Sequence, residues 1–387
     1  MKPSLIDRII KRNTSIVRRD FSDWKLAQLS AQSVSNPRQV LLQTLYSDVM
    51  QDALMSSQID TLRIGKSKAA DFDLVDSQGN TDEQATEQFK ASGLYEQFAG
   101  YIVESLFYGF TVAEITGGKV RTVPRSYIEP TEGVFYPDQY GHSGISYRKL
   151  REYGRTILEF YPKEGALGYI NKAVPYVLIK KFALSCWSEF CEIFGMPPRI
   201  LKTNTQDSEM LTRAESMMRE IGSAAYAIID TTEDINFGQS VSTDGTIYEK
   251  LISKCDGQIS LINLAAVLGQ DTVNGNYSKE ESSAKLLDDV VASDKKLIES
   301  YFNTLILPAL AHNGMVKDGL RLRISKSKDI EALWNKTVQA MPYFNIEPKW
   351  IKDTFGIEVT DPKVSSLSCP PPTCPPSMSE GLDSFFA

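Results

Sequence analysis

Residues 166–195, ALGYINKAVPYVLIKKFALSCWSEFCEIFG, form a long segment whose pattern predicts a helix. The segment starts after Gly165 and stops at Gly195 and the proline pair that follows, which is a typical helix end. Pro175 lies inside it, where the missing amide donor should kink or divide the helix. This helix separates a strand-rich region before it from a series of long helices after it.

The region before this helix combines helices with short strands. The pattern predicts, in chain order, a helix that starts at Pro37 and runs through RQVLLQTLYSDVMQDAL, extended segments within 57–76, a helix over 82–108, a hairpin of FTVAEI (110–115) and KVRTV (119–123), and short strands up to residue 162.

The region after the helix begins with a small unit and continues with long helices. The pattern predicts that the small unit consists of a strand over 198–203, a helix over 206–221 and strands over 224–230 and 234–239. It then predicts helices over 246–268 and 282–312 joined by the polar segment GQDTVNGNYSKEE, a strand over 320–325, and short helices over 328–340 and 347–355. Pro308 should kink the end of the second long helix. From residue 363 onward, proline and serine dominate, and this composition predicts disorder.

Composition limits the class of protein. The chain has 387 residues, with 42 Lys and Arg against 49 Asp and Glu, and this mild acidity argues against a conventional nucleic-acid-binding module. It contains no apolar run of about 18 residues, so a membrane-spanning helix is not expected. The number of cysteines, five, is odd, which predicts a protein with reduced thiols. A disulfide between Cys369 and Cys374 is the alternative that the sequence leaves open.

Residues that could support catalysis are few. The two histidines, His142 and His312, have no Cys or His at ligand spacing, so we expect neither a metal nor a cofactor. Gly65-Lys66-Ser67 resembles the end of a phosphate-binding loop, but Asp60 stands where that loop needs glycine. We expect a strand and a turn there, and no enzymatic activity.

Several local stretches, in a shared order, carry a resemblance. They are LFYGFTVAEI (106–115), the segment from Lys180 to Pro197 with Trp187, Phe190 and Gly195, ISK (252–254), LGQ (268–270), Ser283-Ala284 and Ser293-Asp294. These stretches resemble the Mu-type portal protein family of tailed bacteriophages and prophages. A glycine usual before Ser-Ala in that family is Ser282 here, and the region after 330 is short for a long helical crown.

The resemblance implies an α+β portal-protein fold. Its expected parts are an N-terminal wing (1–165), a first stem helix (166–195), a clip (196–242), a second stem helix (243–268), a tunnel loop (269–281), a long tunnel-side helix (282–313), a C-terminal wing with a short crown (314–362) and a disordered tail (363–387).

The function implied by the resemblance is that of a non-enzymatic ring, usually of twelve subunits, at one capsid vertex. Double-stranded DNA would pass through it during packaging and ejection. Its partners would be the terminase large subunit, head–tail adaptors and the capsid or scaffold protein. It would lie in the virion, and in the host cytoplasm during assembly, with no membrane contact.

Two groups of residues are candidate sites under this interpretation. The tunnel loop would contact DNA transiently through Gln270, Asn274, Gly275, Asn276 and Lys279. The clip helix would offer Met210, Met217 and Met218 to partner proteins. An ordinary surface loop and ordinary core methionines would look the same in sequence. The alternative for the whole chain is a monomeric helical scaffold or adaptor with a docking tail.

The charge of the long helices and the size of the stem residues are consistent with this role. Residues 246–313 carry six lysines against nine acidic residues, a balance of −3, which suits a channel that does not hold DNA and also suits a solvated helix face. Small and apolar stem positions would allow close packing between neighbouring subunits, or within one chain: Ala173, Ala183, Cys186, Ala265 and Ala266.

Overall fold

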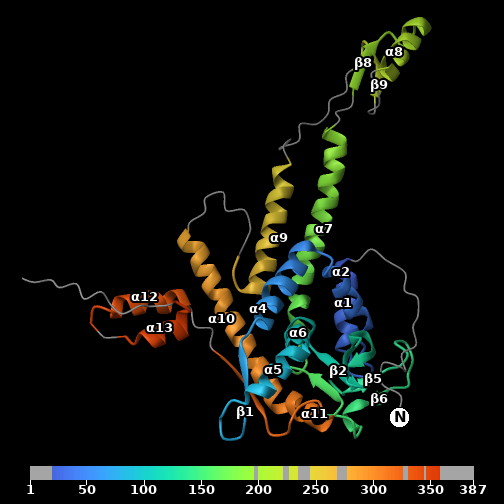
Figure 1. Cartoon of the computed structure of the whole chain (residues 1–387). Coiled ribbons are helices and arrows are strands. Elements are labelled where there is room, and N and C mark those ends of the chain that lie inside the picture. The colour runs from blue at the N-terminus through green and yellow to red at the C-terminus, as the bar shows by residue number, and fades with distance from the viewer. Residues whose placement is uncertain are drawn as a thin grey trace, which may run out of the picture. The chain divides into compact units, whose positions relative to one another are not determined.

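The structure is a computed structural model that describes residues 20–195, 199–220, 226–233, 245–267, 277–325, 330–343 and 346–357. The chain divides into two compact units, Met1–Ser325 and Lys326–Ala387, which are described separately. Helices dominate the first unit and short strands accompany them (Figure 1). This mixed architecture confirms the expected α+β class.

The N-terminal part of the first unit is mostly helical. Its elements are α1 (Phe21–Ala31), α2 (Val40–Val49), α3 (Ala53–Ser56), the π-helix η2 (Ser57–Ile64), α4 (Gly65–Lys68), strand β1 (Phe72–Val75), α5 (Glu83–Ser92) and α6 (Leu94–Tyr108).

Three expectations for this part need correction. The helix expected from Pro37 begins at Val40 and ends at Val49, because Asp52 caps a new helix through the amides of Leu54 and Met55. The helix expected over 82–108 is two helices, separated at Gly93, whose φ of 67° is left-handed.

The third correction concerns residues 57–68, where we expected a strand and a turn. They are helical, as η2 and α4. The buried residues of η2 are Gln58, Ile59, Arg63 and Ile64, a spacing that places them on one helical face. The β-branched residues favour a strand locally, but burial of this face stabilises the helical conformation instead.

Two small antiparallel sheets follow α6, as the sequence predicted. The first has the order β3–β2–β7, with β2 (Thr111–Thr116), β3 (Lys119–Val123) and β7 (Ile157–Phe160), and Ile115 lies opposite Val120. The second has the order β4–β5–β6, with β4 (Ile128–Glu129), β5 (Val134–Phe135) and β6 (Ile145–Ser146). The 3₁₀ turns η3 (Arg125–Tyr127) and η4 (Tyr147–Lys149) lie beside these strands.

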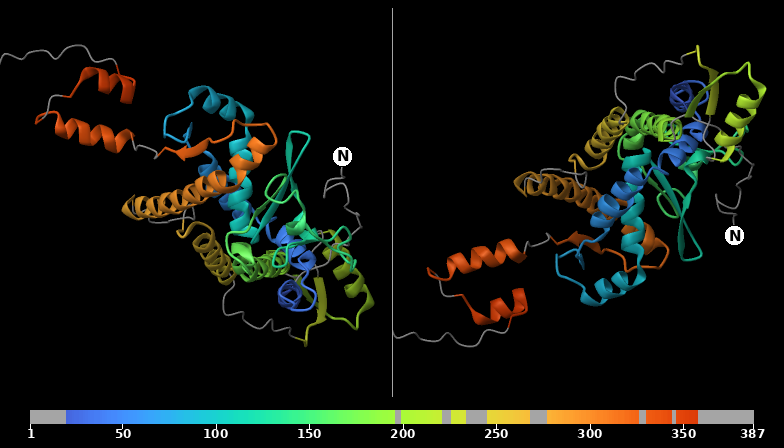
Figure 2. Two further views of the ribbon diagram at one scale, coloured as in Figure 1. Left: turned by 90° about the horizontal axis from the view of Figure 1, so that it is seen from below. Right: turned by 90° about the horizontal axis from the view of Figure 1, so that it is seen from above.

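The long helices also follow the predicted order, with changed bounds. They are α7 (Gly168–Gly195), α9 (Thr246–Leu264), α10 (Tyr277–Tyr301), the π-helix η5 (Phe302–Ile306) and α11 (Leu307–His312), after which β10 (Arg321–Ile324) pairs antiparallel with β1. Helices α7 and α9 pack side by side, as both views of Figure 2 show.

The two prolines act differently from each other. Pro175 does not divide α7, which continues through it as one helix. Pro308 stands in the first turn of α11, directly after the π-helical residues Phe302–Ile306. Because Pro308 has no amide to donate, the helix adjusts its hydrogen-bonding pattern in the preceding turn, and the expected irregularity takes the form of a π-helix.

Helix α9 ends at Leu264, four residues earlier than expected, where Ala265 adopts a positive φ of 57°. Helix α10 begins at Tyr277, five residues earlier than expected. The connection is therefore residues 265–276, which lies four to five residues earlier in the chain than the predicted segment 269–281 and is one residue shorter. Within the described helices of the chain, none is long and apolar enough to cross a membrane.

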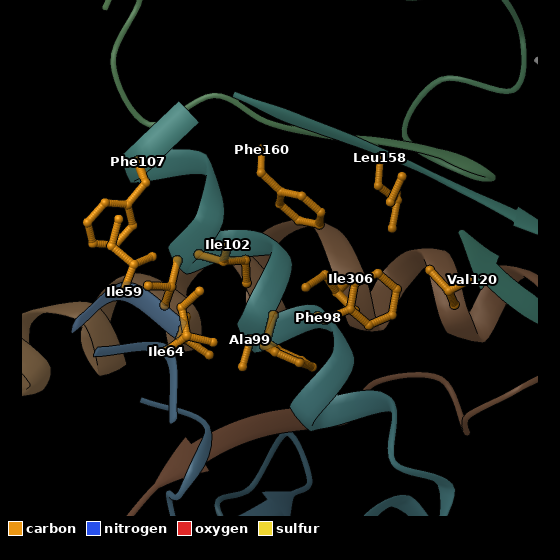
Figure 3. Close-up of a cluster of buried hydrophobic side chains, with 14 of the residues drawn as sticks. Ile59, Ile64, Phe98, Ala99, Ile102, Phe107, Val120, Leu158, Phe160 and Ile306 are labelled. Carbon is orange, nitrogen blue, oxygen red and sulfur yellow. The ribbon is translucent and has the colours of Figure 1, made fainter. Parts of the chain in front are cut away.

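A shared apolar core holds the helices and the first sheet together. Phe98, Ile102 and Phe107 of α6 meet Ile59 and Ile64 on one side and strand residues on the other, among them Phe160 and Leu158 of β7 (Figure 3). Tyr95 stacks on Phe302 with ring centroids 5.4 Å apart. Full burial of such side chains contributes roughly 1.5–3 kcal/mol each, so α6 is the central packing element.

The small unit after α7 is a strand–helix–strand: β8 (Arg199–Thr203), α8 (Ser208–Glu220) and β9 (Tyr226–Asp230), with β8 and β9 parallel. Asp230 accepts hydrogen bonds from the backbone and side chain of Thr232 and of Thr205, which hold the pKa of its carboxyl well below the usual range. The strand expected over 234–239 lies outside the described residues.

The second unit contains α12 (Ile330–Ala340) and α13 (Pro348–Phe355). The Phe355 ring lies 5.0 Å from that of Trp334 and 5.7 Å from that of Trp350. Both helices confirm the sequence expectation. The tail expected to be disordered, 363–387, lies outside the described residues.

The junction of α6 and α7 gives a test of this packing. A β-carbon at Gly168 would lie 2.1 Å from the Phe107 carbonyl oxygen, whereas one at Gly165 would meet nothing within 4 Å. Both glycines have positive φ. Gly165→Ala should therefore cost about 1 kcal/mol of unfolding free energy for strain alone, and Gly168→Ala at least about 3 kcal/mol. Chemical denaturation of both variants checks this, and equal losses would contradict the close approach.

Candidate functional site

The candidate site is the pair of helices that carries the connection from α9 to α10. The predicted tunnel-loop residues Gln270, Asn274, Gly275 and Asn276 lie outside the described residues. Lys279 does not belong to a loop, because it lies in the first turns of α10. The structure describes the two helices at the base of this connection.

Arg63 of η2 connects these two helices. Its Nε and Nη2 donate to the two carboxylate oxygens of Asp294 in α10, at 2.7 and 3.0 Å. Its Nη1 donates to the backbone carbonyl of Asn263 in the last turn of α9, at 2.9 Å. Both charged side chains are buried, with 7% and 4% exposure. A paired arginine fork of this kind is strong and directional.

A second set of polar contacts packs η2 against α9. Gln58 Nε2 donates to Ser260 Oγ at 2.7 Å, and Asn263 Nδ2 lies 3.3 Å from Gln58 Oε1 and 3.4 Å from Met55 Sδ. These side chains are buried. Buried amides are costly to leave unpaired, so this set specifies the register between η2 and the end of α9.

The outer rim of the same region is exposed. Lys66 of α4 pairs with Asp288 of α10 at 2.9 Å, with both side chains largely in solvent. A pair of this kind is worth at most about 1 kcal/mol. Gly65-Lys66-Ser67 thus lies in a helix that continues directly from η2, with no preceding loop that could wrap a phosphate.

Helices α7 and α9, which correspond to the predicted stem helices, share a second charged contact. Lys180 Nζ of α7 lies 3.0 Å from Asp52 and 2.7 Å from Asp256 of α9. Desolvation would lower the pKa of Lys180, but hydrogen bonds to the two carboxylates outweigh it and raise that pKa. Asp256 and Asp294 therefore both form ion pairs within the chain.

The small residues expected at the stem fall into two groups. Ala173 and Ala183 are buried within the chain, where they bring helices of the same subunit together. Ala266 is also buried, while Cys186 is half-buried and Ala265 is exposed. Close packing by the alanines of α7 is thus a feature of the single chain.

Apolar side chains on the stem helices are exposed instead. Phe182 of α7 is 59% exposed, and Ile247, Leu251 and Leu261 of α9 are 62%, 41% and 46% exposed. At 100° per residue, the three α9 side chains fall within about 80° of one another, so they share one face. A groove of about 570 Å³ lies beside this face and shares Leu261 with it; Lys250, Lys254 and Gly257 also line the groove.

The three methionines predicted to lie in a clip differ in exposure. Met210 and Met217 of α8 are 53% and 47% exposed, whereas Met218 is 7% exposed. In this fold Met210 and Met217 are accessible to a partner, while Met218 packs into the interior of its own unit. Among the residues that the structure describes, no group of three or more His, Cys, Asp or Glu side chains could hold a metal ion.

Sequence reasoning missed Arg63 and Lys180 as organising residues. Arg63 lies in a stretch whose pattern predicts a strand, and that pattern does not indicate that the arginine is buried. A single arginine between apolar Leu62 and Ile64 was the available signal. Lys180 was noted only as part of a family-like stretch, and its two carboxylate partners are distant in sequence.

Comparison with known proteins identifies a family. The family model described as the portal protein of Mu bacteriophage matches residues 43–357. No curated protein matches the sequence. Among solved structures, a chain of the virion of a native gene transfer agent particle is similar, with 13% identity and a TM-score of 0.48 over 88% of this chain and all of that chain. A chain from the neck of such a particle, computed with C12 symmetry, has 13% identity and a TM-score of 0.47 over 87% of this chain and 99% of that chain.

The Lys180 contact gives a test of the stem. Lys180→Met leaves two carboxylates without their shared cation and should cost about 2 kcal/mol at neutral pH. Lys66→Met removes an exposed pair and should cost no more than about 1 kcal/mol. Urea unfolding measures both, and equal losses would contradict the role of Lys180.

The pH dependence of the same variant has a definite sign. Because the pKa of Lys180 is raised in the folded state, its contribution is complete below the ordinary lysine pKa of about 10.4 and is lost as pH rises through the folded value. The stability gap between wild type and Lys180→Met should therefore shrink above about pH 10.4. A gap that widens with pH would contradict this assignment.

Proposed function

Because the chain belongs to the family of the portal protein of Mu bacteriophage, we propose that it assembles as the portal ring of a phage or prophage particle. Portal proteins of this family are structural, non-enzymatic components of the particle. In this proposal copies of the chain form a closed ring of about twelve subunits at one capsid vertex. Double-stranded DNA enters and leaves through its centre.

The observation that carries the proposal is the exposed apolar face of α9. Ile247, Leu251 and Leu261 lie on a helix whose opposite side already packs on α7. Exposed apolar side chains aligned on one helix face are typical of a surface covered by another protein. A ring of identical subunits covers such a face in every copy.

The face of α7 that carries Phe182 is a suitable counterpart. Glu189 is exposed two turns further along the same face of α7, and Lys250 and Lys254 are exposed beside Leu251 on α9. Within the chain, Phe190 of α7 contacts Tyr248 of α9, and Lys180 of α7 contacts Asp256 of α9. The two helices are therefore antiparallel, and Glu189, next to Phe190, lies at the same level along the helix axis as the first turns of α9. The two faces are therefore complementary in both apolarity and charge, as a head-to-tail ring contact requires.

The remaining elements receive roles from the same proposal. The clip, with exposed Met210 and Met217, contacts the terminase large subunit and later the head–tail adaptor, since flexible methionines adapt to more than one partner. The predicted wing regions, residues 1–165 and 314–362, contact the capsid or scaffold protein. The ring belongs to the virion and assembles in the host cytoplasm.

The connection between α9 and α10 is proposed as the tunnel loop, with Gln270, Asn274, Gly275 and Asn276 near the DNA. Lys279, in the first turns of α10, would lie at the edge of the loop. A loop that is polar rather than strongly basic allows phosphates to pass, because each tight phosphate contact adds affinity and would slow movement.

The ring contact is tested by Leu251→Glu, which places a charge in the apolar face. We expect a folded chain that no longer forms rings, because a buried unpaired charge is costly. Leu29→Glu is the matched control, since Leu29 is 71% exposed on α1. Light scattering with negative-stain imaging measures the ring. Rings formed equally by both variants would argue against this face, and a wild-type chain that stays monomeric at high concentration would favour the adaptor alternative.

The loop is tested by deleting residues 270–275, all of which precede α10. Ring assembly should persist because the stem contacts are retained, while DNA filling of capsids should fall. A variant that replaces the same six residues with glycine and serine separates the effect of length from that of side chains. Capsids filled to the wild-type level by the deletion variant would sink the tunnel-loop assignment.

A further inference from the structure

The helices at the base of the α9–α10 connection meet at one buried point. Leu264 at the end of α9 forms a small apolar cluster with Leu287 and Val291 of α10, and Leu62 of η2 packs against it. Arg63 directly follows Leu62, Asp294 lies three residues after Val291, and the two form the buried ion pair. Helix α10 is therefore held in its middle, well away from its beginning.

This arrangement makes the first part of α10 a lever. Leu287, the first residue of the buried contact, lies 10 residues after Tyr277, the start of the helix, which corresponds to about 15 Å at 1.5 Å per residue. A rotation of α10 by about 10° at this contact would move the start of the helix by roughly 2–3 Å. Small changes at the contact are thus enlarged at the start of α10.

Arg63 is placed to set that angle. Its three hydrogen bonds reach α9 and α10 together, so neither helix can turn without loss of a bond. The carbonyl of Asn263 belongs to the last turn of α9, where carbonyls have no partner within the helix and a cation is favoured. The guanidinium carbon also lies 5.1 Å from the Phe107 ring of α6 and 5.4 Å from the Tyr169 ring of α7.

We propose that Arg63 is a positioning residue that fixes the angle between α9 and α10. It thereby fixes the place of the connecting loop relative to the start of stem helix α7. The inference deepens the proposed function, since it concerns the loop assigned to DNA passage. It does not depend on a side chain within the loop. The exposed pair of Lys66 and Asp288 links α4 to α10 without burial and makes no bond to α9, so it cannot fix the angle between α9 and α10 to the same degree.

The test separates this role from simple stabilisation. Arg63→Met leaves Asp294 buried and unpaired, and this variant can fail to fold. The double variant Arg63→Met/Asp294→Leu removes the pair without leaving a buried charge, and such replacements often keep stability. Arg63→Lys keeps the charge but loses the fork. Lys66→Met is the matched control, with a lost contact to α10 at the surface.

Hydrogen exchange of residues 277–286 is the first measurement, made on the full chain. We expect exchange in the double variant to be about tenfold faster than in wild type, an intermediate value for Arg63→Lys, and no change for Lys66→Met. The melting temperature of the double variant is measured alongside, so that local and global loosening are distinguished. Wild-type exchange in the double variant would overturn the inference, as would an equal rise throughout the chain.

DNA filling of capsids is the second measurement. Rings should form in the double variant, and the fraction of filled capsids should fall, because the connecting loop is no longer held in place. Normal filling would overturn the positioning role. If the wild-type chain forms no ring, the proposed function fails, and the exchange comparison on that monomer still decides whether Arg63 fixes the helix angle.

Discussion

The guanidinium of Arg63 lies where four helices come together, and their arrangement depends on it. One side of the group is bonded to Asp294 and to the carbonyl end of α9, and its carbon lies near rings of α6 and α7. A buried charge without partners costs several kcal/mol, so the pair imposes a single geometry on the helices that supply its partners. The apolar core around α6 provides most of the stability, but apolar contacts alone would tolerate other helix angles.

The stem shows the same division between stability and specificity. Ala173 and Ala183 are buried and let α7 pack closely inside the chain, and Lys180 fixes the height of α7 against α9 through Asp256. The outward sides of these helices retain exposed apolar residues such as Phe182 and Leu251. A chain that satisfies its inner stem contacts and leaves its outer ones open is suited to assembly with copies of itself.

Much of the architecture could be predicted from local pattern. The hairpin at Gly117 and Gly118, the strand–helix–strand after α7 and the order of the long helices follow from periodicity and turn residues. The stretch 57–68 could not be predicted in this way, because its β-branched residues favour a strand and only burial against α9 makes it a helix. The candidate loop was found from its polarity, but it was placed four to five residues too late in the chain, since Ala265 ends α9 early with a left-handed conformation that alanine rarely adopts.

The sequence by itself determined the class of fold, the order of its elements and the resemblance to a family. These depend on periodicity and motifs among residues that are close together in the sequence. Only the tertiary structure decided which charged residues organise the molecule. Arg63 and Asp294 are 231 residues apart, and Lys180 meets partners on either side of it in the chain. The physical reason is that an ion pair becomes strong and directional only when burial removes water from both groups, and burial is a property of the packed chain.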